Sequence, residues 1–451
     1  MAGFKKRIED VLLNAHSNLP HQDAGPKRRI FVAYSGGGDS SALLHAIANS
    51  AIRDTLEIVA AHINHGLIDA SDEWENHCRD FAKRLGLRFE SLRLSKHPQN
   101  KQNVEAWARE QRYSWLQALS SGGDFVVTAH HLDDQLETFL LRLFRGSGPF
   151  GLSAIKPEQP FGRGYLIRPM LDITKPDIEK YLSRYEIDYI DDPSNQSLNL
   201  DRNYLRHSVL PLIRQRWPHA AEKVAQAAYL QQQLASGLER NAFALLEEIS
   251  AGDGECVLVE KLKALDAQQR YLVVRAWCNR RRLGVPEGKH VSELEKILAT
   301  DEPSASMRLT WKNAELRYYQ GMFYLRPRQR DFDPTQRFAW DMQIPLELPH
   351  GRLQKCDTLS GGLSKTVLGK DCEVGFYRHD GERCHPQKRN HSQTLKKLFQ
   401  SWRVPPWERQ RVPIIRIEGS IAAVVPYCVC RPFAAADGDS GIALEFSPSN
   451  S

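Results

Sequence analysis

The chain has 451 residues, of which 41% are hydrophobic and 26% are charged, and its formal net charge is +6 at pH 7. This length exceeds one ordinary domain, and the composition excludes a chain that is disordered throughout. The mild basic excess permits an anionic partner but does not require one.

Residues 30 to about 130 alternate apolar, strand-like runs with helical patterns. Strands separated by helices predict an α/β fold with a parallel sheet that is covered on both faces. Ligands of such sheets bind beyond the carboxyl ends of the strands. We expect strands at 30–34, 56–63, 88–94 and 125–129, and helices at 40–51, 72–85, 104–119 and 133–144.

The remaining chain has different patterns. Residues 145–215 are rich in glycine and proline and then become basic, so we expect loops and short helices that close over the ligand edge of the sheet. Helical patterns continue to about residue 305, and short alternating segments with turn signals follow from about 308. We therefore predict three domains: an α/β domain at 1–216, a mostly helical domain at 217–307 and a small α+β domain at 308–451.

The first expected strand leads directly into a glycine-rich loop, Ser35-Gly36-Gly37-Gly38-Asp39-Ser40. Glycines let the backbone turn tightly and approach an anion, and the N–H groups at the start of the following helix favour a phosphate. Asp39 is unusual at an anion site, but it suits a Mg²⁺ ion that bridges phosphates. A Walker loop is excluded because no lysine follows, and the dinucleotide fingerprint would need glycine where Ser41 stands. The alternative is a plain surface turn.

A cluster of histidines and carboxylates follows the fourth expected strand, in the string from His130 to Thr138. On a helix, Glu137 shares a face with either Asp133 or Asp134. Such a group can hold a metal ion, recognise a cationic amine or act as a general base. Ordinary capping of a helix N-terminus is the alternative.

Two arginines on the third expected helix form another candidate. Arg109 and Arg112 share a helical face and suit a phosphate or a carboxylate. A solvated helix face is the alternative for this pair.

The eight cysteines are scattered without a Cys-x-x-Cys pair, so we expect no disulfide framework. Cys428 and Cys430 have the spacing of half a metal site, but we interpret them as two small apolar residues in a buried strand. No apolar run approaches the roughly 20 residues that span a bilayer, and the N-terminus lacks a signal-peptide pattern. We expect a cytoplasmic protein without a membrane partner.

The glycine-rich loop after an apolar strand resembles the pyrophosphate-loop (PP-loop) signature of the N-type ATP pyrophosphatases. These enzymes have an adenine nucleotide alpha hydrolase-like fold, release pyrophosphate from ATP and activate a carbonyl oxygen as an adenylate. Further strings narrow the resemblance to the bacterial tRNA(Ile)-lysidine synthetases. These strings lie at 61–67, 130–138, 143–152, 167–171, 191–195, 201–206, 391–399 and 405–409.

This resemblance implies an ATP-dependent ligase that joins free L-lysine to the wobble cytidine of the isoleucine tRNA with a CAU anticodon. The product, lysidine, changes decoding from AUG to AUA. The cytidine O2 attacks the α-phosphate of ATP and pyrophosphate leaves, and the lysine ε-amine then displaces AMP at C2. We expect basic clusters with neighbouring aromatic residues in the C-terminal half to dock the tRNA. A homodimer is left open.

The resemblance also implies roles for individual residues. ATP is assigned to Ser35, Gly36, Gly37, Gly38, Asp39 and Ser40, with Ala33 and His62, and Mg²⁺ to Asp39. Lysine binding and catalysis are assigned to Asp134, Glu137, Asp133, His130, Arg109 and Arg112. The adenylated intermediate or the tRNA is assigned to Arg202, Arg206 and Arg145.

Three rival functions remain. A PP-loop tRNA thiolase needs catalytic cysteines or a cluster site near the ATP, but residues 1–216 contain only Cys78, on an expected helix. An RNA-free amide or amidine ligase does not explain two additional basic domains. A tRNA-binding protein with a vestigial loop does not explain the intact Asp39 and Glu137.

Overall fold

The computed structural model describes residues 2–19, 27–66, 70–94, 104–192, 198–252, 254–301, 303–304, 306–329, 332–358, 361–377, 381–436 and 438–449. The chain forms two compact units, Met1–Leu238 and Glu239–Ser451. Within the described ranges, no helix is both long and apolar enough to cross a lipid bilayer.

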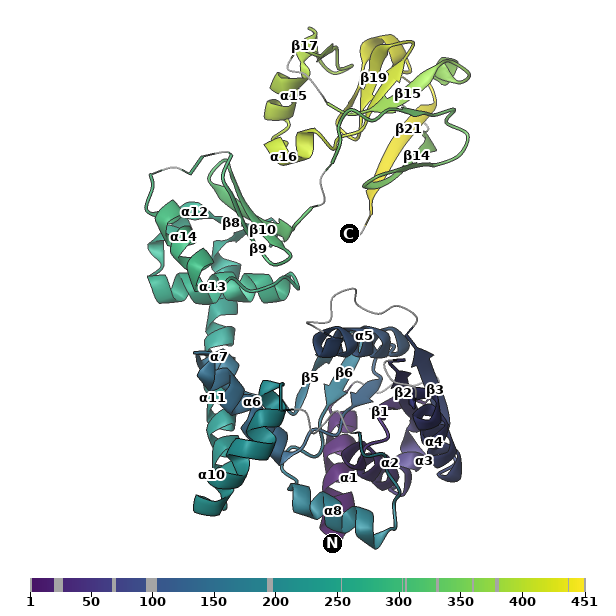
Figure 1. Ribbon diagram of the computed structural model, residues 1–451. Coiled ribbons are helices and arrows are strands. Elements are labelled where there is room, and N and C mark those ends of the chain that lie inside the picture. Colours follow the sequence, from purple (N-terminus) through teal and green to yellow (C-terminus); the bar gives the residue numbers. More distant parts are fainter. Residues whose placement is uncertain are drawn as a thin grey trace. The chain divides into compact units, whose positions relative to one another are not determined.

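The first unit is built on a six-stranded sheet with the strand order β3-β2-β1-β4-β6-β5 (Figure 1). Strands β3, β2, β1, β4 and β6 are parallel to one another, whereas β5 runs antiparallel to β6 at one edge. The predicted parallel sheet is therefore confirmed. Its strands are β1 (Arg29–Ala33), β2 (Glu57–Asn64), β3 (Arg88–Arg93), β4 (Phe125–Val127), β5 (Glu158–Phe161) and β6 (Gly164–Ile167).

Helices cover both faces of this sheet because successive side chains of each strand point to opposite faces. Ile30 and Val32 of β1 pack into a core with α1, α2, α4 and α8, whereas Phe31 packs with residues of α5 on the other face. The helices of this unit are α1 (Ala2–Ser17), α2 (Gly38–Ala48), α3 (Ile52–Thr55), α4 (Ser71–Arg84), α5 (Val104–Leu119), α6 (Leu132–Phe144), α7 (Pro149–Leu152), α8 (Lys175–Arg184), α9 (Asp201–Tyr204), the π-helix η3 (Leu205–Val209) and α10 (Leu210–Arg216).

The strand order reverses at β1, which lies between β2 and β4. The chain passes from β1 to β2 on one side and reaches β4 on the other, so the loops after β1 and β4 separate into a crevice. The glycine-rich loop follows β1 and the His-Asp-Asp cluster follows β4, which brings the two main sequence motifs to one place.

One segment of the first unit differs from the prediction. The sequence of residues 145–215 predicts loops and short helices, but β5 and β6 form a hairpin there and extend the sheet. The hairpin turns at Gly162, which has a φ of +59°. Two strands of four residues each, surrounded by glycine and proline, carry too few alternating positions to be recognised from the sequence.

Helix α11 (Ala220–Ile249) begins in the first unit and ends in the second. The second unit contains an antiparallel sheet with the strand order β7-β8-β11-β10-β9, whose apolar residues form a core around the buried Trp277. The domain boundaries remain a prediction, and strands from both sides of residue 307 join this sheet. Its elements are β7 (Ser250–Ala251), β8 (Cys256–Leu258), α12 (Val259–Ala264), α13 (Ala267–Arg280), α14 (Gly288–Leu298), β9 (Arg308–Trp311), β10 (Ala314–Tyr319) and β11 (Met322–Pro327).

The C-terminal part of this unit has the predicted short, alternating strands. They form sheets with the orders β12-β15-β18-β19-β20, β13-β14-β21 and β16-β17. The elements are β12 (Phe338–Ala339), β13 (Leu346–Leu348), β14 (Gly351–Thr358), the 3₁₀ helix η4 (Lys365–Val367), β15 (Cys372–Gly375), β16 (Arg383–Cys384), β17 (Gln393–Thr394), α15 (Leu395–Ser401), α16 (Pro406–Arg409), β18 (Ile414–Ile417), β19 (Ser420–Val424), β20 (Cys428–Val429), the 3₁₀ helix η5 (Arg431–Phe433) and β21 (Gly441–Pro448).

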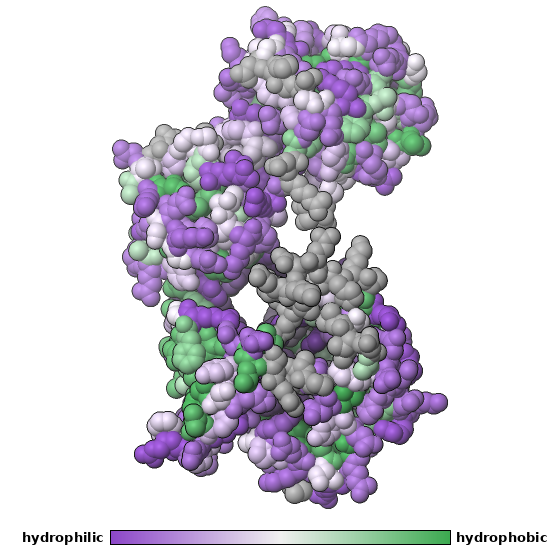
Figure 2. Space-filling model, in the orientation of Figure 1, coloured by the Kyte–Doolittle hydropathy of each residue, from purple (hydrophilic) through white to green (hydrophobic). Residues whose placement is uncertain are grey.

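Hydrophilic residues cover most of the face that Figure 2 shows, and apolar residues gather over the segment of α10 and α11. Leu212 of α10 and Leu230 and Leu234 of α11 are all exposed. Scattered exposed apolar residues are normal in globular proteins, but a group of this kind marks a surface that can be covered.

Candidate active site

The glycine-rich loop joins the end of β1 to the start of α2. Gly36 has a φ of +87°, and a Cβ atom there would lie 2.6 Å from Ile190 Cδ1 and 2.9 Å from Cys78 Sγ. Only glycine fits this conformation and this space. The Oγ atoms of Ser35 and Ser40 lie 3.1 Å apart across the loop. The loop therefore has the shape and the polar groups of an anion-binding turn at a helix N-terminus.

A cavity of about 440 Å³ opens at the carboxyl ends of β1, β2 and β4. Its volume falls within the range of roughly 300–1,000 Å³ that is usual for small-ligand sites. The cavity brings together residues that are distant in the sequence and that were predicted to bind ATP or lysine. These residues are Ala33, Ser35, Asp39, Ser40, His62, Arg109, Arg112, His130 and Asp134.

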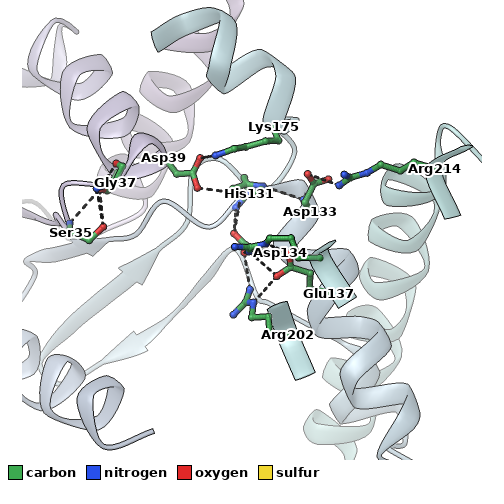
Figure 3. A network of polar contacts seen from close by, with 12 residues as sticks. Ser35, Gly37, Asp39, His131, Asp133, Asp134, Glu137, Lys175, Arg202 and Arg214 are labelled. Atoms are coloured by element: carbon green, nitrogen blue, oxygen red, sulfur yellow. Dashed lines mark hydrogen bonds and ion pairs between the residues drawn. The ribbon is translucent and has the colours of Figure 1, made fainter. Parts of the chain in front are cut away.

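Asp39 contacts both Lys175 of α8 and His131 at the start of α6, and it thereby links the loop to these two helices (Figure 3). Lys175 Nζ lies 2.6 Å from Asp39 Oδ1, and His131 Nε2 lies 3.5 Å from Asp39 Oδ2. Burial alone would raise the pKa of Asp39, but the contacts with His131 and Lys175 outweigh it and lower the pKa to about 2. Asp39 is therefore a carboxylate at every physiological pH.

His131 connects Asp39 to the start of α6. Its backbone N–H donates to Asp134 Oδ2 at 2.9 Å, and its Nδ1 accepts from the backbone N–H of Asp133 at 3.3 Å. This reciprocal capping box fixes the first turn of α6. The capping alternative that the sequence left open is thus realised, and the same carboxylate also lines the cavity.

Asp134 and Glu137 are paired with two arginines. Arg202 donates from Nη2 to Asp134 Oδ1 at 2.7 Å and from Nε to Glu137 Oε2 at 2.6 Å. Arg206 donates from Nε to Glu137 Oε1 at 2.7 Å. The Glu137 side chain is fully buried, so these bonds supply the compensation that a buried charge requires. Asp134 and Glu137, which were assigned to lysine, therefore lie in one cluster with Arg202 and Arg206, which were assigned to the intermediate or the tRNA.

Arg206 lies on η3, a π-helical turn between α9 and α10. Single π-helical turns are rare, and they occur frequently at functional sites. The carboxylates are three residues apart on α6, and the arginines are four apart, so each pair can present both members to the other.

Two predicted site residues lie elsewhere. Asp133 forms an ion pair with Arg214 at 2.7 Å, and Arg145 is exposed and lies 3.5 Å from Asp201. Neither Asp133 nor Arg145 lines the cavity. Asp133 is one helical position away from Asp134 and therefore points about 100° around the helix from it.

Two histidines of the cavity are held in defined states. His62 Nδ1 lies 2.9 Å from the carbonyl oxygen of Tyr34 and must donate to it, so Nε2 is an acceptor. Burial lowers the pKa of His62 and lowers that of His130 to about 4, so both rings are neutral at pH 7. His130 Nδ1 contacts Thr128 Oγ1 at 2.8 Å.

A second cavity of about 270 Å³ shares Arg109 and His130 with the first. Its lining is strongly basic and contains Arg202 together with other cations. Such a lining favours an anionic group of a ligand. The cationic residues are Arg109, Arg142, Lys156, Arg168 and Arg202.

Sequence reasoning missed three groups of this site: Lys175, His131 and Arg168. His131 stands in the recognised string and was passed over for its neighbour His130. Arg168 directly follows β6 and stands in the string at 167–171, but it was given no role, whereas Lys175 begins α8 after the N-cap Thr174 and reaches the site through packing that no local pattern reveals.

Comparison with known proteins agrees with this geometry. Family models match residues 5–213 as a PP-loop domain, 258–324 as a TilS substrate binding domain and 373–446 as a TilS substrate C-terminal domain. The tRNA(Ile)-lysidine synthase of Coxiella burnetii is 35% identical over 92% of this chain and 93% of its own length. The enzyme of the same name from Alkalilimnicola ehrlichii is 33% identical over 94% and 95%.

Among solved structures, the U34-tRNA thiolase NcsA of Methanococcus maripaludis with its [4Fe-4S] cluster covers 51% of this chain and 80% of its own, at 15% identity and a TM-score of 0.41. That likeness is too weak to carry an argument about activity. The identity and coverage of the curated relatives are decisive, and the chain belongs to the tRNA(Ile)-lysidine synthase family.

Proposed function

We propose that the chain converts the wobble cytidine of the CAU-anticodon isoleucine tRNA to lysidine, with consumption of ATP and formation of a carbon–nitrogen bond. One observation carries the proposal: a single cavity unites the phosphate loop with Asp134 and His130. The reaction needs both groups, because the cytidine must be adenylated and then attacked by an amine in the same place.

ATP is assigned to the first cavity, with its phosphates at the loop and the start of α2. The residues present fit a Mg²⁺ ion, because Asp39 offers a carboxylate oxygen and Ser35 and Ser40 offer hydroxyls beside it. Bound there, Mg²⁺ would neutralise the charge of the phosphates. Lys175, which contacts Asp39 in this structure, would then be released to contact a phosphate oxygen.

Lysine is assigned to the boundary of the two cavities. Its carboxylate suits the basic cavity, where Arg109 lines both spaces, and its amine would reach toward Asp134 in the first cavity. Because Asp134 and Glu137 are already paired, the ammonium group must displace Arg202 or Arg206 from them. The displaced arginine then becomes available to a phosphate of the adenylated cytidine or of the tRNA.

The test is incorporation of radiolabelled lysine into CAU-anticodon isoleucine tRNA in the presence of ATP and Mg²⁺. The methionine tRNA with the same anticodon is the matched control. We expect label on the isoleucine tRNA only, and none with Asp39→Ala. Release of pyrophosphate without label on either tRNA would retain the ATP chemistry and overturn the substrate.

A further inference from the structure

Three cysteines of the second unit meet away from the active site. Cys384 lies in β16, Cys428 lies in β20, and Cys430 follows that strand. Their sulfur atoms all lie within 4.8 Å of one another. Cys384 and Cys430 are buried, whereas Cys428 is partly exposed. No other group of three or more potential metal ligands is found in the part of the chain that the structure describes.

The backbone holds this cluster together. Cys428 and Cys430 are two residues apart along an extended segment, so their side chains point to the same side. The segment 385–387 is fastened to the segment 429–431 by hydrogen bonds from Gln387 N to Val429 O at 2.9 Å and from Arg431 N to His385 O at 2.8 Å. This pairing brings Cys384 next to the other two, which the sequence alone did not indicate.

We propose that these three thiols form a binding site for a thiophilic divalent cation such as Zn²⁺. A zinc–sulfur bond of about 2.3 Å gives a sulfur–sulfur distance of about 3.8 Å in a tetrahedral site. The sulfur atoms need only small side-chain adjustments to reach that distance. Binding releases the thiol protons to solvent, and the partial exposure of Cys428 gives an ion a way in.

The surroundings agree with a ligand role. The three thiols lie in an apolar core that also contains Leu395, Leu398 and Phe399, so few other polar groups compete for an ion there. His385 is adjacent to Cys384, and its Nε2 donates to the carbonyl oxygen of Arg389 at 2.9 Å. Histidine ligands usually donate their second nitrogen to a carbonyl in this way, but His385 lies outside the group of ligand atoms within 4.8 Å of one another, so its Nδ1 would have to move to become a fourth ligand.

The consequence is mechanical. An ion here would link β16 to β20 and fix the segment that leads through β17 into α15. That segment carries Lys388, Lys396 and Lys397, which belong to the basic clusters of the C-terminal part.

The experiment uses the full-length, reduced protein after treatment with a chelator. Co²⁺ is titrated in, and the thiolate-to-cobalt charge-transfer absorption is recorded, followed by competition with Zn²⁺. The variants are Cys428→Ser, at the partly exposed position, and Cys356→Ser as a control at an exposed cysteine of β14. Thermal unfolding and circular dichroism establish that each variant is folded.

We expect one equivalent of Co²⁺ with thiolate absorption, displaced by Zn²⁺, and affinity at least about tenfold weaker in Cys428→Ser than in Cys356→Ser. Absence of thiolate absorption in the parent protein overturns the proposal. If Cys428→Ser does not fold, X-ray absorption of the zinc-loaded parent protein decides. Three sulfur ligands at about 2.3 Å support the site, and fewer than three overturn it.

Discussion

Lys175 Nζ lies 2.6 Å from Asp39 Oδ1, so an ammonium group occupies the carboxylate that we assign to Mg²⁺. The two residues come from the starts of different helices, α8 and α2, which pack against each other through Ile178 and Leu182 in the core of the first unit. Lys175 is thus positioned to respond when a cation reaches Asp39.

This relationship predicts a role for Lys175 in ATP binding. In Lys175→Met the released ammonium can no longer contact a phosphate, and a charge-assisted hydrogen bond of about 1.5–3 kcal/mol is lost. We expect KM for ATP to rise about tenfold or more while KM for lysine is unchanged. Steady-state kinetics check this, with Lys180→Met on the exposed face of α8 as the control. An unchanged KM for ATP in Lys175→Met would limit Lys175 to a structural partner of Asp39.

Glu137→Gln tests the buried cluster. The side chain is fully buried, and its loss of charge leaves Arg202 and Arg206 with reduced compensation. Breaking a buried pair by removing one charge typically costs about 3–5 kcal/mol, so we expect a clearly lower unfolding temperature. Differential scanning calorimetry measures it, and Glu179→Gln on exposed α8 should leave it unchanged. Equal unfolding temperatures for both variants would contradict the assigned pairing.

Gly36→Ala tests the shape of the phosphate loop. The new Cβ atom would meet Ile190 at 2.6 Å and Cys78 at 2.9 Å, with a φ of +87° that alanine rarely adopts. We expect ATP binding to weaken by at least about tenfold. Gly38→Ala is the milder control, because its nearest contact is Leu182 Cδ1 at 3.1 Å and its φ is not positive. Equilibrium binding of ATP to both variants is the measurement, and equal affinities would rule out the steric argument.

Asp124 is expected to make stability depend on pH. Burial would raise its pKa, but hydrogen bonds from Arg29 and Ser121 outweigh this and lower the pKa. A lowered folded-state pKa contributes stability above the unfolded value of about 3.9, and this contribution is lost as the pH falls through the folded value. Asp124→Asn should therefore unfold at a lower temperature than the parent protein at pH 7, and the difference should shrink as the pH falls below about 4. A difference that does not change with pH would show that shape, rather than charge, is lost.

Cys78→Ser separates the proposed reaction from tRNA thiolation. Burial raises the pKa of Cys78 to about 12, and the thiol lies inside the core of the first unit, so it is a poor nucleophile. We expect Cys78→Ser to incorporate lysine at the rate of the parent protein once folding is verified. A loss of activity in a folded variant would revive the thiolase alternative.

Much of the first unit follows from its sequence. Three apolar runs predicted the central strands β1, β2 and β4, because strands buried on both faces are continuously apolar, whereas the edge strand β3 alternates polar and apolar residues. The hairpin of β5 and β6 was not predicted, because each strand is short and lies among glycines and prolines. Strands β7 and β8 were not predicted either, because segments of two and three residues cannot show an alternating pattern.

The site was predicted in part. Loop motifs at the ends of β1 and β4 converge because the topology of a parallel sheet requires it, so Asp39 and Asp134 could be placed together. Lys175 could not, because its approach to Asp39 depends on how α8 packs on α2. The arginine partners of Glu137 were recognised as site residues, but their pairing arises from a π-helical turn that no local pattern indicates.

Each carboxylate of the polar chain from Lys175 to Arg206 is paired with at least one cation: Asp39 with Lys175, and Asp134 and Glu137 with Arg202 and Arg206, while His131 lies between Asp39 and Asp134. Any charge that enters this site must be compensated, because an uncompensated buried charge is strongly disfavoured. When a metal ion or an ammonium group binds, either an anion must therefore bind with it or one of the cations Lys175, Arg202 and Arg206 must move away.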